Sequence, residues 1–268
     1  MNKGLISDSR LLPSPLRTVR SEDRDKIRAI VRKAYGLAAG MQETTMILSR
    51  NCSSSDPANP VNTACCNTNG LGCGDPTDLA ALQPGETVLD LGSGPGFDCF
   101  VAALHVGKRG RVVGIDFTPE MAQLARRNAA EAGVVTVSFV LGDIERLPTL
   151  DEVFDVVISN CVINLCPDKT RVLTEAHRVL RRGGRLAVSD IVALAPLPRE
   201  IVDDLALHSG CVAGAATVDE MSMALHEAGF NSVRIDIREE SNKLINAWAP
   251  DCGFERFVAA ANITATRY

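Results

Sequence analysis

The sequence predicts an α/β protein built on a mostly parallel β-sheet with helices on both faces. From Glu86 onward, short apolar runs alternate with helical stretches, and this alternation is typical of parallel sheets with crossover helices. The first apolar run leads directly into a turn with three glycines, Gly92–Gly96. Such a turn usually opens a ligand-binding crevice in this architecture.

The predicted sheet lies within residues 81–192. A helix through Val106 follows the first strand, and a second is expected between Thr118, as N-cap, and Gly133. A third is expected at Asp168–Leu180. The expected strands are Thr87–Leu91, Arg111–Ile115, Val137–Leu141, Phe154–Ser159 and Arg185–Asp190.

The flanking regions are less regular. Residues 1–80 form a lead-in, with a helix predicted at Ser21–Ala39 and a loop rich in Asn, Ser, Pro and Gly after Arg50. Residues 193–268 are interpreted as a small substrate-capping region, although their two predicted strands could instead extend the sheet. The elements expected there are helices at Pro198–Ser209 and Val218–Ala228 and strands at Val233–Ile237 and Phe257–Ala261.

Composition excludes several classes of function. The chain has 268 residues, 46% of them hydrophobic, so it can bury a substantial core. Its net charge of -5 offers no basic face to a nucleic acid. No apolar run approaches the ~20 residues of a membrane span, and no secretory signal is evident. We therefore expect no nucleic-acid or membrane partner and a cytoplasmic location.

The glycine-rich turn predicts a nucleotide site. Asp116 ends the second strand, where a carboxylate can accept both ribose hydroxyls. Phe97 stands where the NAD fingerprint requires its third glycine, which argues against NAD. The G-x-G-x-G pattern with Asp90 two residues before it resembles motif I of the Rossmann-like class I methyltransferases, and this implies S-adenosylmethionine as the donor. The candidate cofactor-binding residues are Asp90, Gly92, Ser93, Gly94, Gly96, Asp116, Phe117, Met121, Gly142, Asp143, Ile144 and Asn160.

Nine cysteines are many for such a chain. Their odd number and wide spacing favour metal or redox chemistry over a disulfide framework. The sequence contains no C-x-x-C pair, which argues against a zinc site. Cys161 follows the fourth strand, Cys211 lies in the C-terminal region and Cys73 precedes the first strand. Thiolates suit a soft centre such as arsenic(III). Its lone pair could attack a methyl group without a general base, and none of the four histidines stands out as one.

At these residues the chain resembles the arsenite S-adenosylmethionine methyltransferases, particularly short bacterial members. The resemblance implies that Cys161 and Cys211 bind arsenic(III) and that Cys73 joins them or cycles through a disulfide. A fourth thiol is matched best by Cys52, although Cys65 and Cys66 also lie in that stretch. It further implies a transient partner, thioredoxin or glutathione, that reduces the disulfide. The stretches that carry the resemblance are Val31–Gly36, Leu89–Phe100, Ser159–Lys169, Cys211–Ala215 and Phe257–Ala265.

Two other functions remain open at the level of sequence. One is a class I methyltransferase of a small organic acceptor, such as a quinone or sterol precursor. The other is a thiol-based metalloid-binding protein without turnover. Within the favoured family, the arsenical substrate could be arsenite, methylarsenite or a larger trivalent organoarsenical.

Overall fold

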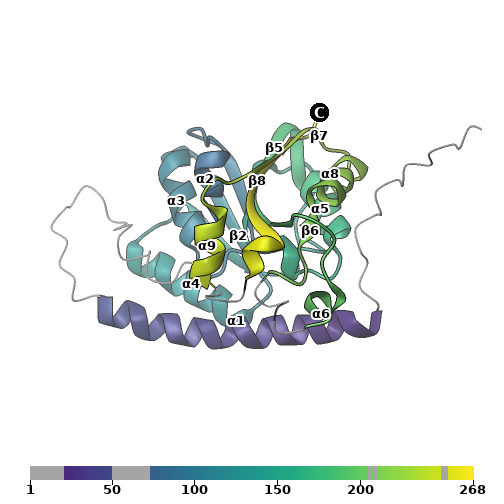
Figure 1. Ribbon diagram of the computed structural model, residues 1–268. Coiled ribbons are helices and arrows are strands. Elements are labelled where there is room, and N and C mark those ends of the chain that lie inside the picture. Colours follow the sequence, from purple (N-terminus) through teal and green to yellow (C-terminus); the bar gives the residue numbers. More distant parts are fainter. Residues whose placement is uncertain (1–20, 50–72, 205–206, 208–210, 249–252) are drawn as a thin grey trace, which may run out of the picture.

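The predicted sheet forms the centre of the structure, a computed structural model that describes residues 21–49, 73–204, 207, 211–248 and 253–268 (Figure 1). The strands follow the order β3-β2-β1-β4-β5-β8-β7, and β6 pairs with β5. β1 to β5 are paired in parallel, whereas β8 is antiparallel to β5 and β7. The predicted fold class is confirmed. The strands are β1 Thr87–Leu91, β2 Arg111–Asp116, β3 Val137–Leu141, β4 Phe154–Asn160, β5 Leu180–Ala193, β6 Ala216–Thr217, β7 Asn231–Ile237 and β8 Val258–Thr266.

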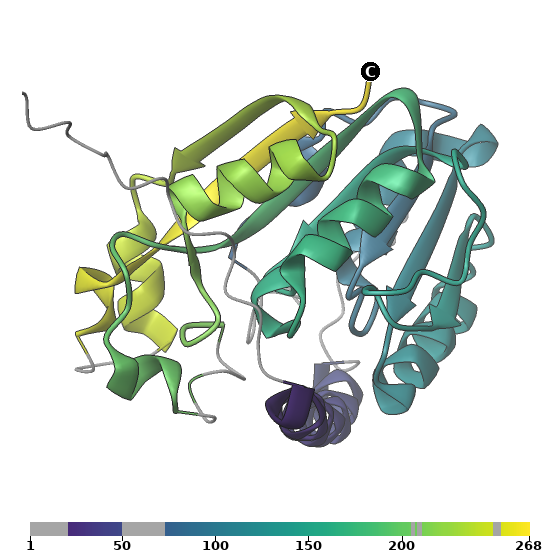
Figure 2. The same cartoon turned by 90° about the vertical axis from the view of Figure 1, so that its right-hand side faces the viewer.

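Helices cover both faces of the sheet (Figure 2). Adjacent residues of a strand point to opposite faces, so Leu89 packs with α5 and α8, whereas Val88 packs with α3 and α4. No helix in the described part of the chain is long and apolar enough to cross a membrane. The helices are α1 Ser21–Ser49, α2 Pro76–Leu79, α3 Phe97–Val106, α4 Pro119–Ala132, α5 Lys169–Val179, α6 Arg199–Val202, α8 Val218–Glu227 and α9 Ser241–Trp248, with short turns η1 Gly107–Arg109, η2 Ile163–Leu165 and η3 Phe254–Arg256.

Local sequence signals located the central helices well. α4 begins at Pro119 and is ended by Gly133, whose φ of +65° suits glycine. The expected side-chain cap is wrong, however, because Thr118 occupies the N-cap position without making a capping hydrogen bond. Its N–H instead donates to Asp116 Oδ1 at 2.8 Å, which ties the start of α4 to the end of β2.

The two ends of the chain differ more from the prediction. α1 continues beyond Ala39 to Ser49. Of the helix expected at Pro198–Ser209, the structure describes α6 Arg199–Val202 and one helical residue at Leu207, while residues 205–206 and 208–209 lie outside the described part. β7 and β8 extend the sheet, because β8 pairs with β5 from Arg185 to Ala193.

α1 lies against the carboxyl edge of the sheet, and three arginines hold it there. Arg24, Arg28 and Arg32 recur every fourth residue and therefore share one face of the helix. Since each binds a different loop, α1 is fixed along much of its first half and closes this edge. Their partners include Asp168, Asp143 and Phe117, respectively.

Candidate functional site

The turn between β1 and α3 requires glycine where a side chain would collide with a neighbour. A Cβ added at Gly92, where φ is +71°, would lie 2.4 Å from Val162 Cγ2. At Gly96, where φ is +97°, it would lie 2.6 Å from Phe139 Cζ. Positive φ alone disfavours most other residues. The backbone can therefore pass close to a ligand at the carboxyl end of β1.

Asp116 fixes this turn from the end of β2. Its Oδ2 accepts a hydrogen bond from the Gly94 N–H at 2.9 Å, and its Oδ1 accepts one from Thr118. Burial raises the pKa of Asp116, although these backbone hydrogen bonds oppose the shift. Each carboxylate oxygen can accept a second hydrogen bond. Asp116 is therefore still able to accept the ribose hydroxyls expected from the sequence.

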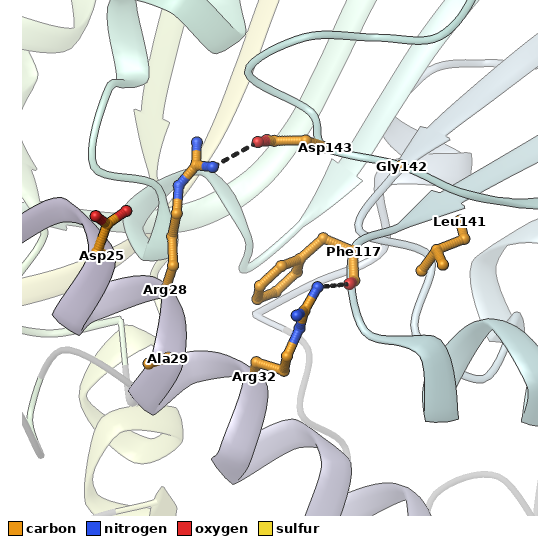
Figure 3. A pocket seen from close by; sticks show the side chains of 8 residues that line it. All are labelled: Asp25, Arg28, Ala29, Arg32, Phe117, Leu141, Gly142 and Asp143. Atoms are coloured by element: carbon orange, nitrogen blue, oxygen red, sulfur yellow. Dashed lines mark hydrogen bonds and ion pairs between the residues drawn. The ribbon is translucent and has the colours of Figure 1, made fainter.

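A cavity of about 410 Å³ lies between α1 and the ends of β2 and β3 (Figure 3). Its volume is within the range of about 300–1,000 Å³ typical of small-molecule sites. Three predicted cofactor residues line one side of it, namely Phe117, Gly142 and Asp143. The remaining lining residues are Asp25, Arg28, Ala29, Arg32 and Leu141.

Arg28 links α1 to the loop after β3, which contains the predicted cofactor residues Gly142 and Asp143 (Figure 3). Its guanidinium lies 2.9 Å from Asp143 Oδ2 and 2.7 Å from Glu145 Oε2. Asp143 Oδ1 accepts a hydrogen bond from the Glu145 N–H at 2.9 Å. Both oxygens of Asp143 are thus oriented before any ligand binds. Arg32 contributes to the same wall, because it donates to the Phe117 carbonyl at 3.2 Å and lies 5.6 Å from the centre of its ring.

Three cysteines from distant parts of the chain meet at the same edge of the sheet. Cys73 precedes α2, Cys161 follows β4, and Cys211 lies between α6 and β6. A disulfide joins Cys73 to Cys161, with 5.7 Å between their Cα atoms. The Cys211 thiol donates to the Cys161 carbonyl at 3.1 Å. All three side chains are buried. The structure therefore brings together the three thiols predicted to bind arsenic.

Backbone geometry distinguishes two of these cysteines. Cys161 has a φ of +53° and Cys211 a φ of +64°, a region that residues other than glycine rarely adopt. Such strain persists where the surrounding structure imposes it, and it is concentrated at functional sites. Burial also raises the pKa of the Cys211 thiol, so this group is protonated in the free chain.

The chain is similar to known methyltransferases. Residues 82–229 match a family model described as a methyltransferase domain. An arsenite methyltransferase of Halobacterium salinarum is 51% identical over 198 residues, which cover 74% of this chain and 51% of that protein. An arsenite methyltransferase of Aquipseudomonas alcaligenes is 40% identical over 196 residues, which cover 70% and 56% of the two chains.

A solved structure extends this similarity. The crystal structure of an arsenic (III) S-adenosylmethionine methyltransferase from Chlamydomonas reinhardtii has 31% sequence identity and a TM-score of 0.62, over 80% of this chain and 75% of that chain. The chain belongs to the arsenite methyltransferase family. The family predicted from the sequence is confirmed, and the chain spans about half the length of the curated relatives it matches.

The remaining predicted cofactor residues of this family member differ in their surroundings. The buried Ser93 hydroxyl in the glycine-rich turn has no hydrogen-bond partner among the described residues. The side chains of Met121 and Ile144 are buried in hydrophobic clusters and are not among those lining the cavity. The Asn160 amide is bonded to the backbone next to Cys73 and to Asp98. Cys52, Cys65 and Cys66 lie outside the described residues.

Asp98 is a candidate cofactor residue that the sequence analysis missed. It lies in the first turn of α3, and its Oδ2 accepts a hydrogen bond from Asn160 Nδ2 at 3.0 Å. Burial raises the pKa of Asp98 to about 6; the charge of Asp75 adds to this effect and the Asn160 hydrogen bond opposes it. Burial and then the charge of Asp98 raise the pKa of Asp90. Two neighbouring buried carboxyls fit a cationic ligand. The sequence feature that could have indicated Asp98 is its position two residues after Gly96, the last glycine of the turn.

Asp190 is a second site residue missed from the sequence, because its sequence position indicates only the end of a predicted strand. One of its carboxylate oxygens and the sulfurs of Cys73 and Cys161 all lie within 4.8 Å of one another. The carboxylate accepts hydrogen bonds from the N–H groups of Ile163 and Ile191 at 3.0 and 2.7 Å. Burial raises the pKa of Asp190 to about 6, against the effect of these hydrogen bonds. The Asp190 carboxylate thus lies directly beside the sulfurs of Cys73 and Cys161.

Proposed function

We propose that this chain transfers methyl groups from S-adenosylmethionine to trivalent arsenic held by cysteine thiolates. The observation that carries the proposal is the convergence of Cys73, Cys161 and Cys211 at the carboxyl edge of the sheet. They lie next to the glycine-rich turn, because Val162, which follows Cys161, packs against Gly92. The substrate would be arsenite or a trivalent organoarsenical. The arsenite methyltransferases among its relatives support this choice over an organic acceptor.

The residues present fit the proposed donor. The cavity beside Phe117 and Asp143 has room for the adenine, and Asp116 can accept the ribose hydroxyls. The Asp98 carboxylate supplies buried negative charge above its pKa of about 6 for the methionine part, which carries an ammonium and a sulfonium group. The buried Asp90 carboxyl, whose pKa burial and Asp98 raise, lies beside it as a second polar group. When bound, S-adenosylmethionine supplies an electrophilic methyl group. The chain contributes by holding that methyl near the thiols.

Thiolate binding prepares arsenic for this reaction. Each protein thiol can replace a hydroxyl of arsenite, with its proton leaving in the released water. Sulfur ligands suit the soft arsenic centre and leave its lone pair free to attack the methyl carbon. Because arsenic loses no proton in this step, no general base is required.

The histidines in the described part of the chain are consistent with a mechanism that needs no general base. His105 is exposed and its ring bonds to the Val101 carbonyl. His177 packs edge-on against Phe230, with ring centres 5.1 Å apart, and the His226 ring bonds to the Phe230 carbonyl. These three rings therefore have local structural roles away from the thiols. His208 lies outside the described residues.

The disulfide supports a reductive step after methyl transfer. Methylation leaves arsenic formally pentavalent. The arsenic-bound sulfurs of Cys73 and Cys161 then join in a disulfide: two arsenic–sulfur bonds break, their electrons restore trivalent arsenic, and a water molecule binds arsenic with loss of one proton. Thioredoxin or glutathione would then reduce the disulfide by thiol exchange. Since this cycle requires reduced thiols, we propose a cytoplasmic location.

The direct test is to incubate the purified chain with S-adenosylmethionine, arsenite and a thiol reductant and to separate the arsenic species by chromatography. We expect methylated arsenic and an equivalent amount of S-adenosylhomocysteine. Methylarsenite and an aromatic trivalent arsenical are tested in parallel to define the substrate. Arsenical binding without any methylated product from all three would contradict the proposal and favour a metalloid-binding protein.

Donor affinity should depend on pH through Asp98. Because burial raises the pKa of this carboxyl to about 6 in the free chain, part of the population is protonated below that pH. A cationic donor favours the ionised form, so binding releases a proton and affinity increases with pH. Below pH 6 we expect the affinity to fall by up to about tenfold per pH unit for one released proton.

Isothermal titration calorimetry between about pH 5 and 7 would measure this dependence. Asp98→Asn cannot release the proton and should give a flatter profile, whereas Asp219→Asn, at an exposed position of α8, should behave like the unmodified chain. A pH-independent affinity in the unmodified chain would rule out this role of Asp98.

A further inference from the structure

The backbone around Cys73 is held from two sides. The Cys73 N–H donates to Asn160 Oδ1 at 2.8 Å, and Asn160 Nδ2 donates to the Gly74 carbonyl at 2.9 Å. From the opposite end of the chain, Arg238 Nη1 donates to the Cys73 carbonyl. Cys73 itself lies outside any helix or strand. These side chains therefore replace the support that regular secondary structure would provide.

Gly74 allows this close approach. A Cβ at that position would lie 2.7 Å from Ser189 Oγ on β5 and 2.9 Å from Arg238 Nη1. The segment is thus packed directly against the sheet and against the guanidinium. Any larger residue would displace the peptide that Arg238 holds.

Arg238 is itself well fixed. It follows β7 directly, and its N–H donates to the Ala260 carbonyl of β8 at 2.9 Å. Its own carbonyl accepts from the Ser241 N–H at 3.1 Å, at the start of α9. Asn160 is the last residue of β4 and immediately precedes Cys161. Asn160 and Arg238, which together clamp the Cys73 backbone, are therefore both anchored to the sheet. The sheet is a rigid support for precise placement of a thiol.

We propose that Arg238 and Asn160 are positioning residues that select Cys73 as the redox and binding partner of Cys161. By holding the Cys73 backbone, they keep its Cα 5.7 Å from that of Cys161, within the range of about 4.4–6.8 Å required for a disulfide. Pre-orientation of two reacting groups increases their effective concentration. This inference rests on the proposed function and assigns the partnership to Cys73 in preference to Cys52, Cys65 or Cys66.

The Asn160 side chain also connects the thiol site with the candidate donor site. Asn160 Nδ2 lies 3.0 Å from Asp98 Oδ2 as well as 2.9 Å from the Gly74 carbonyl. One side chain thus contacts both the Cys73–Gly74 segment and the candidate donor site. The described hydrogen bond of the Arg238 guanidinium is to Cys73, and none of its described bonds reaches the candidate donor site. Substitution of Arg238 therefore separates thiol placement from donor binding, whereas substitution of Asn160 should affect both.

The test compares Arg238→Met with the unmodified chain. The reduced protein is mixed with oxidised glutathione, in which two protein thiols become a disulfide while one oxidised glutathione becomes two reduced molecules. Alkylation stops the reaction, and peptide mass spectrometry quantifies the Cys73–Cys161 link. We expect link formation to slow about tenfold or more, because a charge-assisted hydrogen bond is lost, with unchanged S-adenosylmethionine affinity. Trivalent arsenical binding should weaken by a similar factor.

Matched variants distinguish positioning from general stability. Arg234→Met removes an exposed arginine of β7, the strand that Arg238 follows. Its only described ion pair is with Asp236, so the variant should leave link formation unchanged. Arg238→Lys and Arg238→Gln keep a donor and should restore part of the rate. They also allow the test if Arg238→Met fails to fold.

Two results would overturn the proposal. One is link formation at the normal rate in Arg238→Met; the other is preferential pairing of Cys161 with Cys52, Cys65 or Cys66 in the unmodified chain. The link is measured without arsenic or donor. Failure of the chain to methylate arsenic would therefore reject the proposed function, while the rate of Cys73–Cys161 pairing would still decide the role of Arg238.

Discussion

Replacement of Cys161 or Cys211 by serine should abolish arsenic methylation, with a loss of at least ~1,000-fold in the single-turnover rate. A hydroxyl is a hard, weakly acidic ligand and cannot replace a thiolate on arsenic. Both cysteines lie at positive φ, +53° and +64°, so the fold holds the backbone of each in an unfavourable conformation. That cost is understandable if their sulfurs must point at a common ligand.

Cys166→Ser is the matched control for these two variants. Cys166 is half-buried, and its sulfur contacts the Val162 carbonyl at 3.8 Å, whereas the Cys211 sulfur contacts the Cys161 carbonyl at 3.1 Å and the Cys161 sulfur lies beside that of Cys73. Cys166→Ser should retain normal methylation. S-adenosylmethionine affinity should be unchanged in all three variants, which shows that the donor site is intact. Turnover at the normal rate in Cys161→Ser or Cys211→Ser would refute the thiolate mechanism.

The sheet was largely predictable because its signals are local. β1 and β4 each carry consecutive buried apolar residues, Val88 and Leu89 in β1 and Val156, Val157 and Ile158 in β4, as expected for strands covered on both faces. The C-terminal strands were less certain, since an antiparallel extension of the sheet and a separate cap are compatible with the same short pattern. Pairing of β8 along β5 decides between them. That pairing joins residues far apart in sequence, which periodicity does not report.

The candidate site, too, has features that local sequence predicts and others that depend on distant segments of the chain. The glycine-rich turn and Asp116 were located by spacing alone, because the ligand crevice of this architecture has a fixed position relative to the strands. Convergence of Cys73 with Cys161 depends on chain segments 88 residues apart, and resemblance to a family was needed to expect it. No pattern in the sequence distinguishes Arg28 or Arg238 from the other arginines. Only the fold shows what each guanidinium binds.

Replacement of Asp116 by alanine should weaken S-adenosylmethionine binding by about 100-fold or more, because two charge-assisted hydrogen bonds to the backbone are lost together with the predicted acceptor of the ribose hydroxyls. Asp116 holds the Gly94 N–H at 2.9 Å and the Thr118 N–H at 2.8 Å. Without these bonds, the glycine-rich turn and the start of α4 lose their common anchor. Isothermal titration calorimetry measures the affinity directly.

Arsenical binding separates this effect from unfolding, since the thiols lie on other segments of the chain. Asp116→Ala should still bind a trivalent arsenical with normal stoichiometry, and Asp219→Ala, at an exposed position of α8, should bind the donor normally. Donor affinity within about threefold of normal in Asp116→Ala would mean that the lost hydrogen bonds contribute little. The donor would then have to be held mainly by the cavity under α1, and Arg28 and Asp143 would become the residues to replace next.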